Sequence, residues 1–110
     1  MLFNSNIDNI PIKGILLCMT WTVTTNKKVK KQFKKLPHKI KAALYILTVE
    51  IREQGPVRGN WSNYSPLGNN RHHCHIKKGH PTYVAVWEII DKEIRIVEIT
   101  YVGTHEKAPY

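Results

Sequence analysis

The sequence predicts an α+β domain in which a small antiparallel sheet packs against a helical hairpin, in the order β-α-α-β-β-β. Two patterns lead to this prediction. Apolar residues recur at helical spacing between residues 29 and 51, and strand-like runs follow between residues 71 and 102. The chain has 110 residues and a hydrophobic fraction of 42%, which are enough for one domain with its own core.

The first half of the pattern is a short strand followed by two helices. Residues 20–25 read TWTVTT, which alternates as strands do, and Thr25 or Asn26 can cap the next helix. Pro37 separates this helix from a second one, which Gly55-Pro56 ends. The apolar positions of the first helix are Val29, Phe33 and Leu36, and those of the second are Ile40, Ala43, Leu44, Leu47 and Ile51.

The second half is a loop followed by three strands. Glycines, a proline and asparagines predict a loop over residues 57–70, which Trp61 and Tyr64 are expected to anchor to the core. The predicted strands span residues 71–77, 82–90 and 93–102. In the last strand, the side chains expected to be buried are Ile94, Ile96 and Ile99.

Positive charge is concentrated in one segment. The formal net charge is +9, and the eight lysines between Lys27 and Lys41 have no acidic residue among them. The rest of the chain is therefore close to neutral. Segregated positive charge favours a polyanionic partner such as RNA, whereas the alternative is a lysine-coated helix with no partner.

The first 18 residues differ from the remainder. They are polar, broken by Pro11 and Gly14, and interpreted as an N-terminal extension of uncertain order before a domain over residues 19–110. Met19 is an alternative start. Two cysteines without a Cys-x-x-Cys pair favour the reducing cytoplasm. The apolar stretch at residues 15–19 is far shorter than the roughly 20 residues of a membrane span, so neither insertion nor export is expected.

Five of the six histidines lie in the last 40 residues. Imidazole can both donate and accept a proton near pH 7. Alternate residues of a strand share a face, so Arg71, His73 and His75 are expected to project together, opposite His72 and Cys74. Histidines close to a lysine-rich surface suggest a protein that binds RNA and cuts it. The alternative is that these are ordinary half-buried strand residues.

The run from His72 to His75, His-His-Cys-His, also contains residue types that bind zinc. Adjacent strand residues point to opposite faces, however, and no helix supplies a pair of ligands at i and i+4. Neither a metal nor another cofactor is therefore expected.

Three motifs resemble the RelE/ParE superfamily of bacterial toxins from type II toxin–antitoxin modules. They are the basic hairpin ending at Glu53-Gln54-Gly55-Pro56, the segment GNWSNY at residues 59–64 leading to His75-Ile76, and the terminal Gly103-Thr104-His105. The last two are most similar to the YafQ-like branch. The chain departs from that branch at residues 77–80, Lys-Lys-Gly-His, where the branch has an acidic residue, and it ends in Tyr110 rather than a leucine-phenylalanine pair.

The resemblance implies a ribosome-dependent mRNA endonuclease that a cognate antitoxin neutralises in a hetero-oligomer. RNA cleavage by its 2′-hydroxyl needs a proton acceptor, a proton donor and positive charge near the phosphate. We expect His75 and His105 to be the acid–base pair. The other expected catalytic residues are Arg71, Tyr110, His73 and His80. The expected RNA-binding residues are Lys27, Lys28, Lys30, Lys31, Lys34, Lys35, Lys77, Lys78 and Arg58. Two alternatives remain: a ParE-like toxin that inhibits DNA gyrase without nuclease activity, and a plain RNA-binding module.

Overall fold

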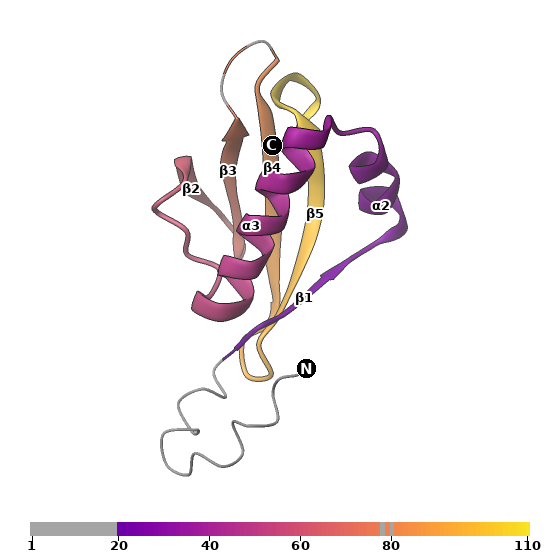
Figure 1. Cartoon of the computed structure of the whole chain (residues 1–110). Helices are drawn as coiled ribbons and strands as arrows, with labels where there is room; N and C mark the ends of the chain where they lie inside the picture. Colours follow the sequence, from indigo (N-terminus) through magenta and orange to yellow (C-terminus); the bar gives the residue numbers. More distant parts are fainter. Residues whose placement is uncertain (1–19, 78, 80) are drawn as a thin grey trace.

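The fold is α+β, with the predicted elements in the predicted order and one additional strand (Figure 1). The computed structural model describes residues 20–77, 79 and 81–110. The predicted extension and the alternative start at Met19 lie outside them. The elements are β1 (Thr22–Thr25), α2 (Lys27–Lys34), α3 (His38–Gln54), β2 (Ser62–Gly68), β3 (Arg71–Lys77), β4 (Tyr83–Asp91), β5 (Ile96–Thr104) and the 3-10 helix η2 (His105–Lys107).

The helical hairpin forms where the sequence predicts it. Asn26 starts α2 because its Oδ1 accepts a hydrogen bond of 2.8 Å from the Val29 N–H. Gly55 ends α3 with a φ of 100°, which favours glycine. The residues that α3 buries are Ile40, Leu44, Leu47 and Ile51. In the part of the chain that the structure describes, no helix has the length and apolar character needed to cross a bilayer.

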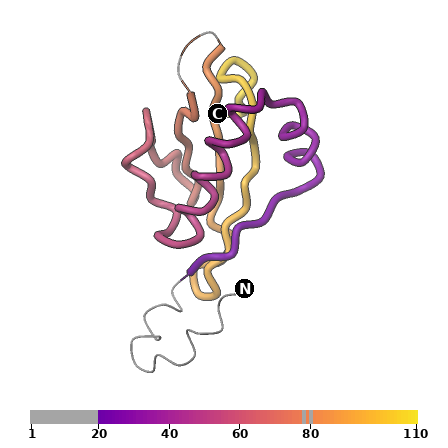
Figure 2. The backbone as a smooth tube through the Cα atoms, viewed as in Figure 1, coloured from indigo at the N-terminus to yellow at the C-terminus, as the bar shows by residue number. Residues whose placement is uncertain are grey.

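The five strands form one mixed sheet in the order β1-β5-β4-β3-β2. The pairs β2–β3, β3–β4 and β4–β5 are antiparallel, whereas β1 pairs in parallel with Ile96–Ile99 of β5. The predicted antiparallel pairing is therefore wrong at β1. The backbone trace in Figure 2 shows β1 alongside the first part of β5. This pairing joins the two ends of the domain, so no local pattern in the sequence specifies its direction.

Residues 57–70 are not a loop throughout, because Ser62–Gly68 form β2. Asn69 and Asn70 both have positive φ, 50° and 63°, and make the tight turn from β2 into β3. Pro66 is tolerated because β2 lies at the edge of the sheet. The register of β2 against β3 shifts twice, so β2 lacks the regular alternation that identifies a strand in a sequence.

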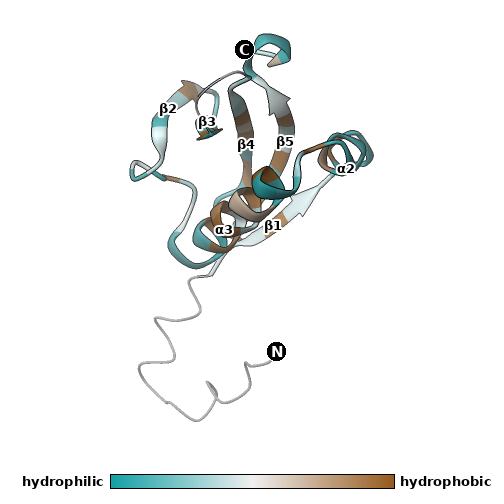
Figure 3. Ribbon diagram, turned by 45° about the horizontal axis from the view of Figure 1, so that its top comes forward, coloured by the Kyte–Doolittle hydropathy of each residue, from teal (hydrophilic) through white to brown (hydrophobic). Residues whose placement is uncertain are grey.

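The main core lies between the helices and one face of the sheet. Figure 3 shows apolar residues along β4, β5 and α3, whereas α2 is largely hydrophilic. Trp87 is the largest fully buried side chain, and Trp61 and Tyr64 pack against this core, as predicted. A second, smaller cluster contains Val84, Val86 and Tyr101. The sheet therefore has one face covered by helices and a second face on which Leu67 of β2 and Ala108 of the C-terminal tail pack against this smaller cluster.

The predicted burial of the last strand is correct in part. Ile99 is buried, with 3% of its surface exposed, and Ile96 is half-buried. Ile94 is 66% exposed, in contrast to the prediction, because β5 begins only at Ile96 and Ile94 lies in the preceding turn. In the sequence, Ile94 extends the alternating apolar pattern to a position before the first residue of the strand.

Two neighbouring residues of α3 provide a test of the core. Leu47 is fully buried, whereas Ile46 is 52% exposed. We expect Leu47→Ala to lower the free energy of unfolding by about 2–5 kcal/mol, because it leaves a cavity in the core. Ile46→Ala, the matched control, should change it by less than about 1 kcal/mol. Urea unfolding followed by circular dichroism measures both, and equal losses would contradict this packing.

Candidate active site

Four ring side chains from two separate segments meet at one place. His73 and His75 come from β3, whereas His105 and Tyr110 come from η2 and the tail that follows it. The ring centroids are 5.4 Å apart for His75 and His105, and 4.6 Å apart for His73 and Tyr110. The centroids of two further pairs, His73–His75 and His105–Tyr110, are 6.0 Å and 6.1 Å apart. We call these four residues the ring cluster.

The ring cluster lies on the sheet face opposite the helices because of the pairing of β3 with β4. His73 pairs with Val86, and His75 pairs with Val84. Both valines belong to the smaller apolar cluster rather than to the core beneath the helices. Directly paired residues share a face of a sheet, so His73 and His75 project together, as the strand period predicts.

His72 and Cys74 face the main core instead. The His72 ring stacks on Trp87 with centroids 6.0 Å apart, and its Nδ1 shares a 2.7 Å hydrogen bond with the Tyr64 hydroxyl. Burial lowers the pKa of His72, so the ring is neutral at pH 7. Burial raises the pKa of the Cys74 thiol to about 12 and disfavours the thiolate that nucleophilic attack or zinc binding requires. Both side chains are therefore structural.

The backbone at His105 is fixed by two hydrogen bonds. The His105 N–H donates to the Thr82 carbonyl at 2.8 Å. The preceding carbonyl, that of Thr104, accepts a hydrogen bond of 2.7 Å from the Tyr101 hydroxyl. To reach Thr104, the Tyr101 ring passes over Gly103, where an added Cβ would lie 2.6 Å from the hydroxyl oxygen. Gly103 is thus required by the close approach of Tyr101, and this approach helps to hold His105 in place.

The members of the ring cluster differ in their electrostatic environment. Burial is the largest influence on the pKa of His73 and lowers it; the Ser65 carbonyl partly raises it, and the charge of His105 lowers it again. His73 is therefore neutral at pH 7, with its Nδ1 3.2 Å from the Ser65 hydroxyl. Burial raises the pKa of Tyr110, so its phenol stays protonated and can donate a hydrogen bond.

Two imidazoles of the ring cluster are accessible to a substrate. His75 is half-buried and His105 is exposed, whereas only 9% of the His73 surface is exposed. A group placed between His75 and His105 can give a proton to one ring and receive a proton from the other. The arrangement is thus chemically suited to acid–base catalysis, with His73 as a neutral support.

No group of three or more His, Cys, Asp or Glu side chains within residues 20–77, 79 and 81–110 is arranged to hold a metal ion. The His-His-Cys-His run provides no such group because its residues alternate between faces. His72 and Cys74 lie in or against the main core, and His73 and His75 lie on the other side of the sheet.

The other predicted catalytic residues are not all brought to the ring cluster. Arg71 shares a face with His75 but begins β3, about 13 Å away at roughly 3.3 Å per residue. Lys77 is exposed at the other end of β3, two residues beyond His75. His80 and Lys78 lie outside the residues that the structure describes.

Arg58, one of the predicted RNA-binding residues, is buried and ion-paired rather than part of the exposed positive surface. Its side chain is 11% exposed, and its Nη1 forms an ion pair of 3.1 Å with Glu50 Oε1. The same oxygen accepts hydrogen bonds of 3.0 Å from Asn60 and 2.8 Å from the Trp61 indole. Hydrogen bonds from Asn60, Trp61 and Arg58 lower the pKa of Glu50 and keep it charged. Arg58 therefore helps to attach the segment after α3 to that helix and does not face solvent.

The remaining predicted RNA-binding lysines are exposed. The helix α2 packs against β5 and buries one side chain, that of Val29. The lysines of α2 and of its C-terminal end lie on the exposed part of the helix. Their positive charges therefore face solvent beside the strand that leads to His105. These exposed lysines are Lys27, Lys28, Lys30, Lys31, Lys34 and Lys35.

Two residues that support the ring cluster are absent from the predicted site. Ser65 hydrogen-bonds to His73 and lies in β2, which the sequence presents as a loop. Tyr101 fixes the Thr104 carbonyl. A large residue two positions before Gly103 on the same strand face is the available signal for Tyr101, because a ring can lean over a glycine at that spacing.

No family model matches the chain, and no curated protein matches it. Several solved structures match the chain. A double mutant of the E. coli toxin RelE in the free state has a TM-score of 0.63 at 21% identity, covering 82% of this chain and 88% of that chain. The chain has the fold of the RelE toxins. The RelE–RelB complex from Pyrococcus horikoshii OT3 gives a TM-score of 0.63 at 13% identity, covering 82% of this chain and 100% of that chain. The intact E. coli RelBE toxin–antitoxin complex gives a TM-score of 0.56 at 23% identity, covering 79% of this chain and 99% of that chain. The RelE-like fold is thereby confirmed, whereas the YafQ-like branch stays a prediction.

The contact between Gly103 and Tyr101 can be tested by a double-mutant cycle. Gly103→Ala should lower the free energy of unfolding by about 1–3 kcal/mol, because the new methyl group meets the Tyr101 hydroxyl. Tyr101→Phe should cost about 1 kcal/mol through the lost hydrogen bond. The double variant should lose less than the sum, because it lacks the clashing oxygen. Gly59→Ala, which has open space around it, is the control. Strictly additive losses in urea unfolding would contradict the contact.

Proposed function

We propose that this chain is the toxin of a type II toxin–antitoxin pair and that it cleaves mRNA on the ribosome as a metal-independent endoribonuclease. The observation that carries the proposal is the approach of His75 and His105, whose ring centroids lie 5.4 Å apart in a chain with the RelE-like fold. The exposed lysines of residues 27–35 support RNA as the substrate, because phosphate contacts dominate the affinity of proteins for nucleic acids.

In the proposed reaction RNA supplies its own nucleophile. One imidazole of the His75–His105 pair removes the proton of a 2′-hydroxyl, and the resulting oxygen attacks the adjacent phosphorus. The bond from phosphorus to the 5′-oxygen breaks, while the other imidazole transfers its proton to that oxygen. The products are a 2′,3′-cyclic phosphate and a 5′-hydroxyl. Each proton transfer accelerates the reaction by about 10²–10⁴-fold.

The other residues of the site have supporting roles in this proposal. His73 remains neutral and positions the rings of His75 and Tyr110, which it contacts. The protonated phenol of Tyr110 stacks on a base or donates a hydrogen bond. Lys77 supplies positive charge near the scissile phosphate, and Lys78 and His80, which follow it in the sequence, are further candidates. Arg71, about 13 Å from His75 along β3, is suited to a neighbouring phosphate.

The proposed protein partner is a cognate antitoxin. The compared structures from E. coli and P. horikoshii pair RelE with RelB. For this chain we propose an equivalent hetero-oligomer in the cytoplasm, in which an acidic antitoxin segment covers part of the lysine-rich surface. Because an acidic segment and RNA would compete for the same positive charge, binding of the antitoxin would block access to the ribosome.

The acid–base assignment predicts the behaviour of two single variants. His75→Ala and His105→Ala should each lower cleavage of translated mRNA by about 100-fold or more, because each removes a proton-transfer group. Primer extension on translated mRNA measures the cleavage. His38→Ala is the matched control, since His38 is an exposed histidine at the start of α3, outside the ring cluster.

Full cleavage by both variants would contradict the assignment. Intact transcripts together with inhibited DNA supercoiling would favour a gyrase inhibitor instead.

Ribosome docking through the lysine-rich helix predicts a change in salt dependence. Replacement of Lys30, Lys31 and Lys34 by glutamate should weaken ribosome binding and flatten its dependence on salt, because fewer counterions are released. Ribosome sedimentation at several salt concentrations measures both effects. The control replaces three exposed cations elsewhere, Lys39, Arg52 and Lys92. A salt slope equal to that of the unmodified protein would refute the docking role.

A further inference from the structure

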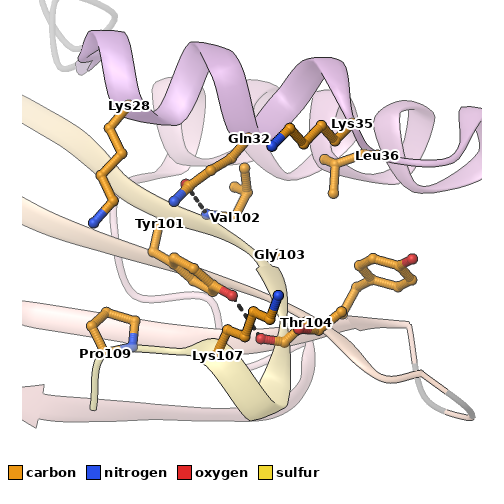
Figure 4. A pocket seen from close by; sticks show the side chains of 11 residues that line it. Lys28, Gln32, Lys35, Leu36, Tyr101, Val102, Gly103, Thr104, Lys107 and Pro109 are labelled. Atoms are coloured by element: carbon orange, nitrogen blue, oxygen red, sulfur yellow. Dashed lines mark hydrogen bonds between the residues drawn. The ribbon is translucent and has the colours of Figure 1, made fainter.

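A pocket of about 400 Å³ lies between α2, the end of β5 and the C-terminal tail (Figure 4). Lys28 reaches it from α2 and Lys35 from the C-terminal cap of that helix, whereas Lys107 reaches it from η2 on the opposite side. Ala108 packs against the apolar cluster that contains Tyr101, and Tyr101 itself lines the pocket. The C-terminal segment therefore contributes to both places, because Lys107 and Pro109 line the pocket, whereas His105 and Tyr110 belong to the ring cluster. The volume of the pocket falls within the range of about 300–1,000 Å³ that is usual for ligand sites.

The charge of this pocket is of one sign. Its described lining contains three lysines, Lys28, Lys35 and Lys107, and no carboxylate side chain. Lys28 and Lys35 are seven residues apart, so they lie two turns apart on the same side of the helical segment. Like charges around a concave surface repel one another, and they focus a positive potential into it. An anion bound between them would relieve that repulsion.

The pocket also offers a ring surface and an oriented amide. Tyr83 and Tyr101 both line it. Gln32 Oε1 accepts a hydrogen bond of 3.1 Å from the Val102 N–H, which fixes the side chain and leaves its amide nitrogen to donate. Aromatic surface combined with positive charge is typical of sites for single-stranded nucleic acid, in which bases stack on rings and cations hold phosphates.

We propose that this pocket is a subsite for one nucleotide of a single-stranded RNA that extends from the ring cluster past the tail. Lys28, Lys35 and Lys107 each contact one phosphate of this strand, at or next to that nucleotide, and the half-buried ring of Tyr83 provides the surface for its base or sugar. The inference rests on the proposed function, which supplies the RNA substrate. His105 and Lys107 are two residues apart, so their Cα atoms are within about 7 Å, and a continuous strand can contact both sites.

The test uses an RNA that cannot be cut. A fluorescent 2′-O-methyl RNA hexamer has no free 2′-hydroxyl for attack, so its binding is independent of cleavage. Replacement of Lys28, Lys35 and Lys107 by glutamine should weaken binding about tenfold or more. The slope of log affinity against log salt should fall by about 2, at roughly 0.7 per lost phosphate contact on a single strand. Fluorescence anisotropy over a salt series measures both values.

The matched control removes the same charge elsewhere. In it, Lys39, Arg52 and Lys92, which are exposed and do not line the pocket, are replaced by glutamine. It should retain most of the affinity and nearly all of the salt slope. Thermal unfolding verifies that both triple variants are folded, and the single variant Lys107→Gln, which should lower the slope by about 0.7, provides the same test with one change.

The outcomes separate the subsite from the nuclease proposal. Equal affinity and equal slope for the pocket and control variants would overturn the subsite, even if the unmodified protein cleaves mRNA. Selective loss of hexamer binding would support it, even if the His75 and His105 variants retain cleavage. A glutamate-rich peptide of matched charge is the competing ligand. If the pocket variant loses affinity for the peptide but not for the hexamer, the pocket belongs to an acidic protein segment and the proposal fails.

Discussion

The candidate site depends on the alternation of β3 between the two faces of the sheet. Two residues of β3, His72 and Cys74, face the helices, and their neighbours His73 and His75 cannot take their places. Cys74 is fully buried, and the His72 ring packs against both Tyr64 and Trp87, with ring centroids 5.8 Å and 6.0 Å away. A slip of one residue would move these side chains outward and put His73 and His75 into the core. The packing of the inner face thus determines which imidazoles the outer face presents.

The second half of the site depends on the C-terminal tail returning to the outer face. Ala108 packs against the cluster formed by Val84, Val86 and Tyr101, and this contact brings Tyr110 back towards β3. The Tyr101 hydroxyl holds the Thr104 carbonyl immediately before η2. Tyr101 therefore has two functions, since its ring supports the tail and its hydroxyl fixes the strand end that carries His105. A conformational change in the tail would alter the ring cluster without any change in β3.

Elements whose patterns are local could be predicted from the sequence. Helical spacing and Gly55 located α3, and strict alternation placed His73 and His75 on one face and His72 and Cys74 on the other. These features follow from the 3.6-residue and two-residue periods of regular structure. Convergence of His75 with His105 could be anticipated only through the resemblance to a family, because periodicity does not specify which strands become neighbours.

The features that could not be predicted depend on partners distant in the chain or on irregular backbone. The strand β2 contains Pro66 and two register shifts, which remove the alternating pattern. Arg58 has the charge of an RNA-binding residue. Its sequence position does not reveal that its side chain is buried and forms an ion pair with Glu50 of α3. The parallel pairing of β1 is likewise a long-range contact. Residue type alone therefore overestimates the exposed positive surface.

The position of the lysine-rich helix has a structural cause in the edge of the sheet. β1 pairs only with Ile96–Ile99, so the outer edge of the rest of β5 lacks a strand partner within the described residues. Exposed strand edges invite aggregation unless another element covers them. Here α2 packs on β5, and Gln32 accepts the hydrogen bond of the Val102 N–H. An eight-residue helix with one buried residue is too short to be stable alone, so this docking maintains it. The contact that protects the edge thereby holds the lysines beside the strand that leads to His105. The positive charge of α2 therefore lies beside His105 because the fold must cover this edge of β5.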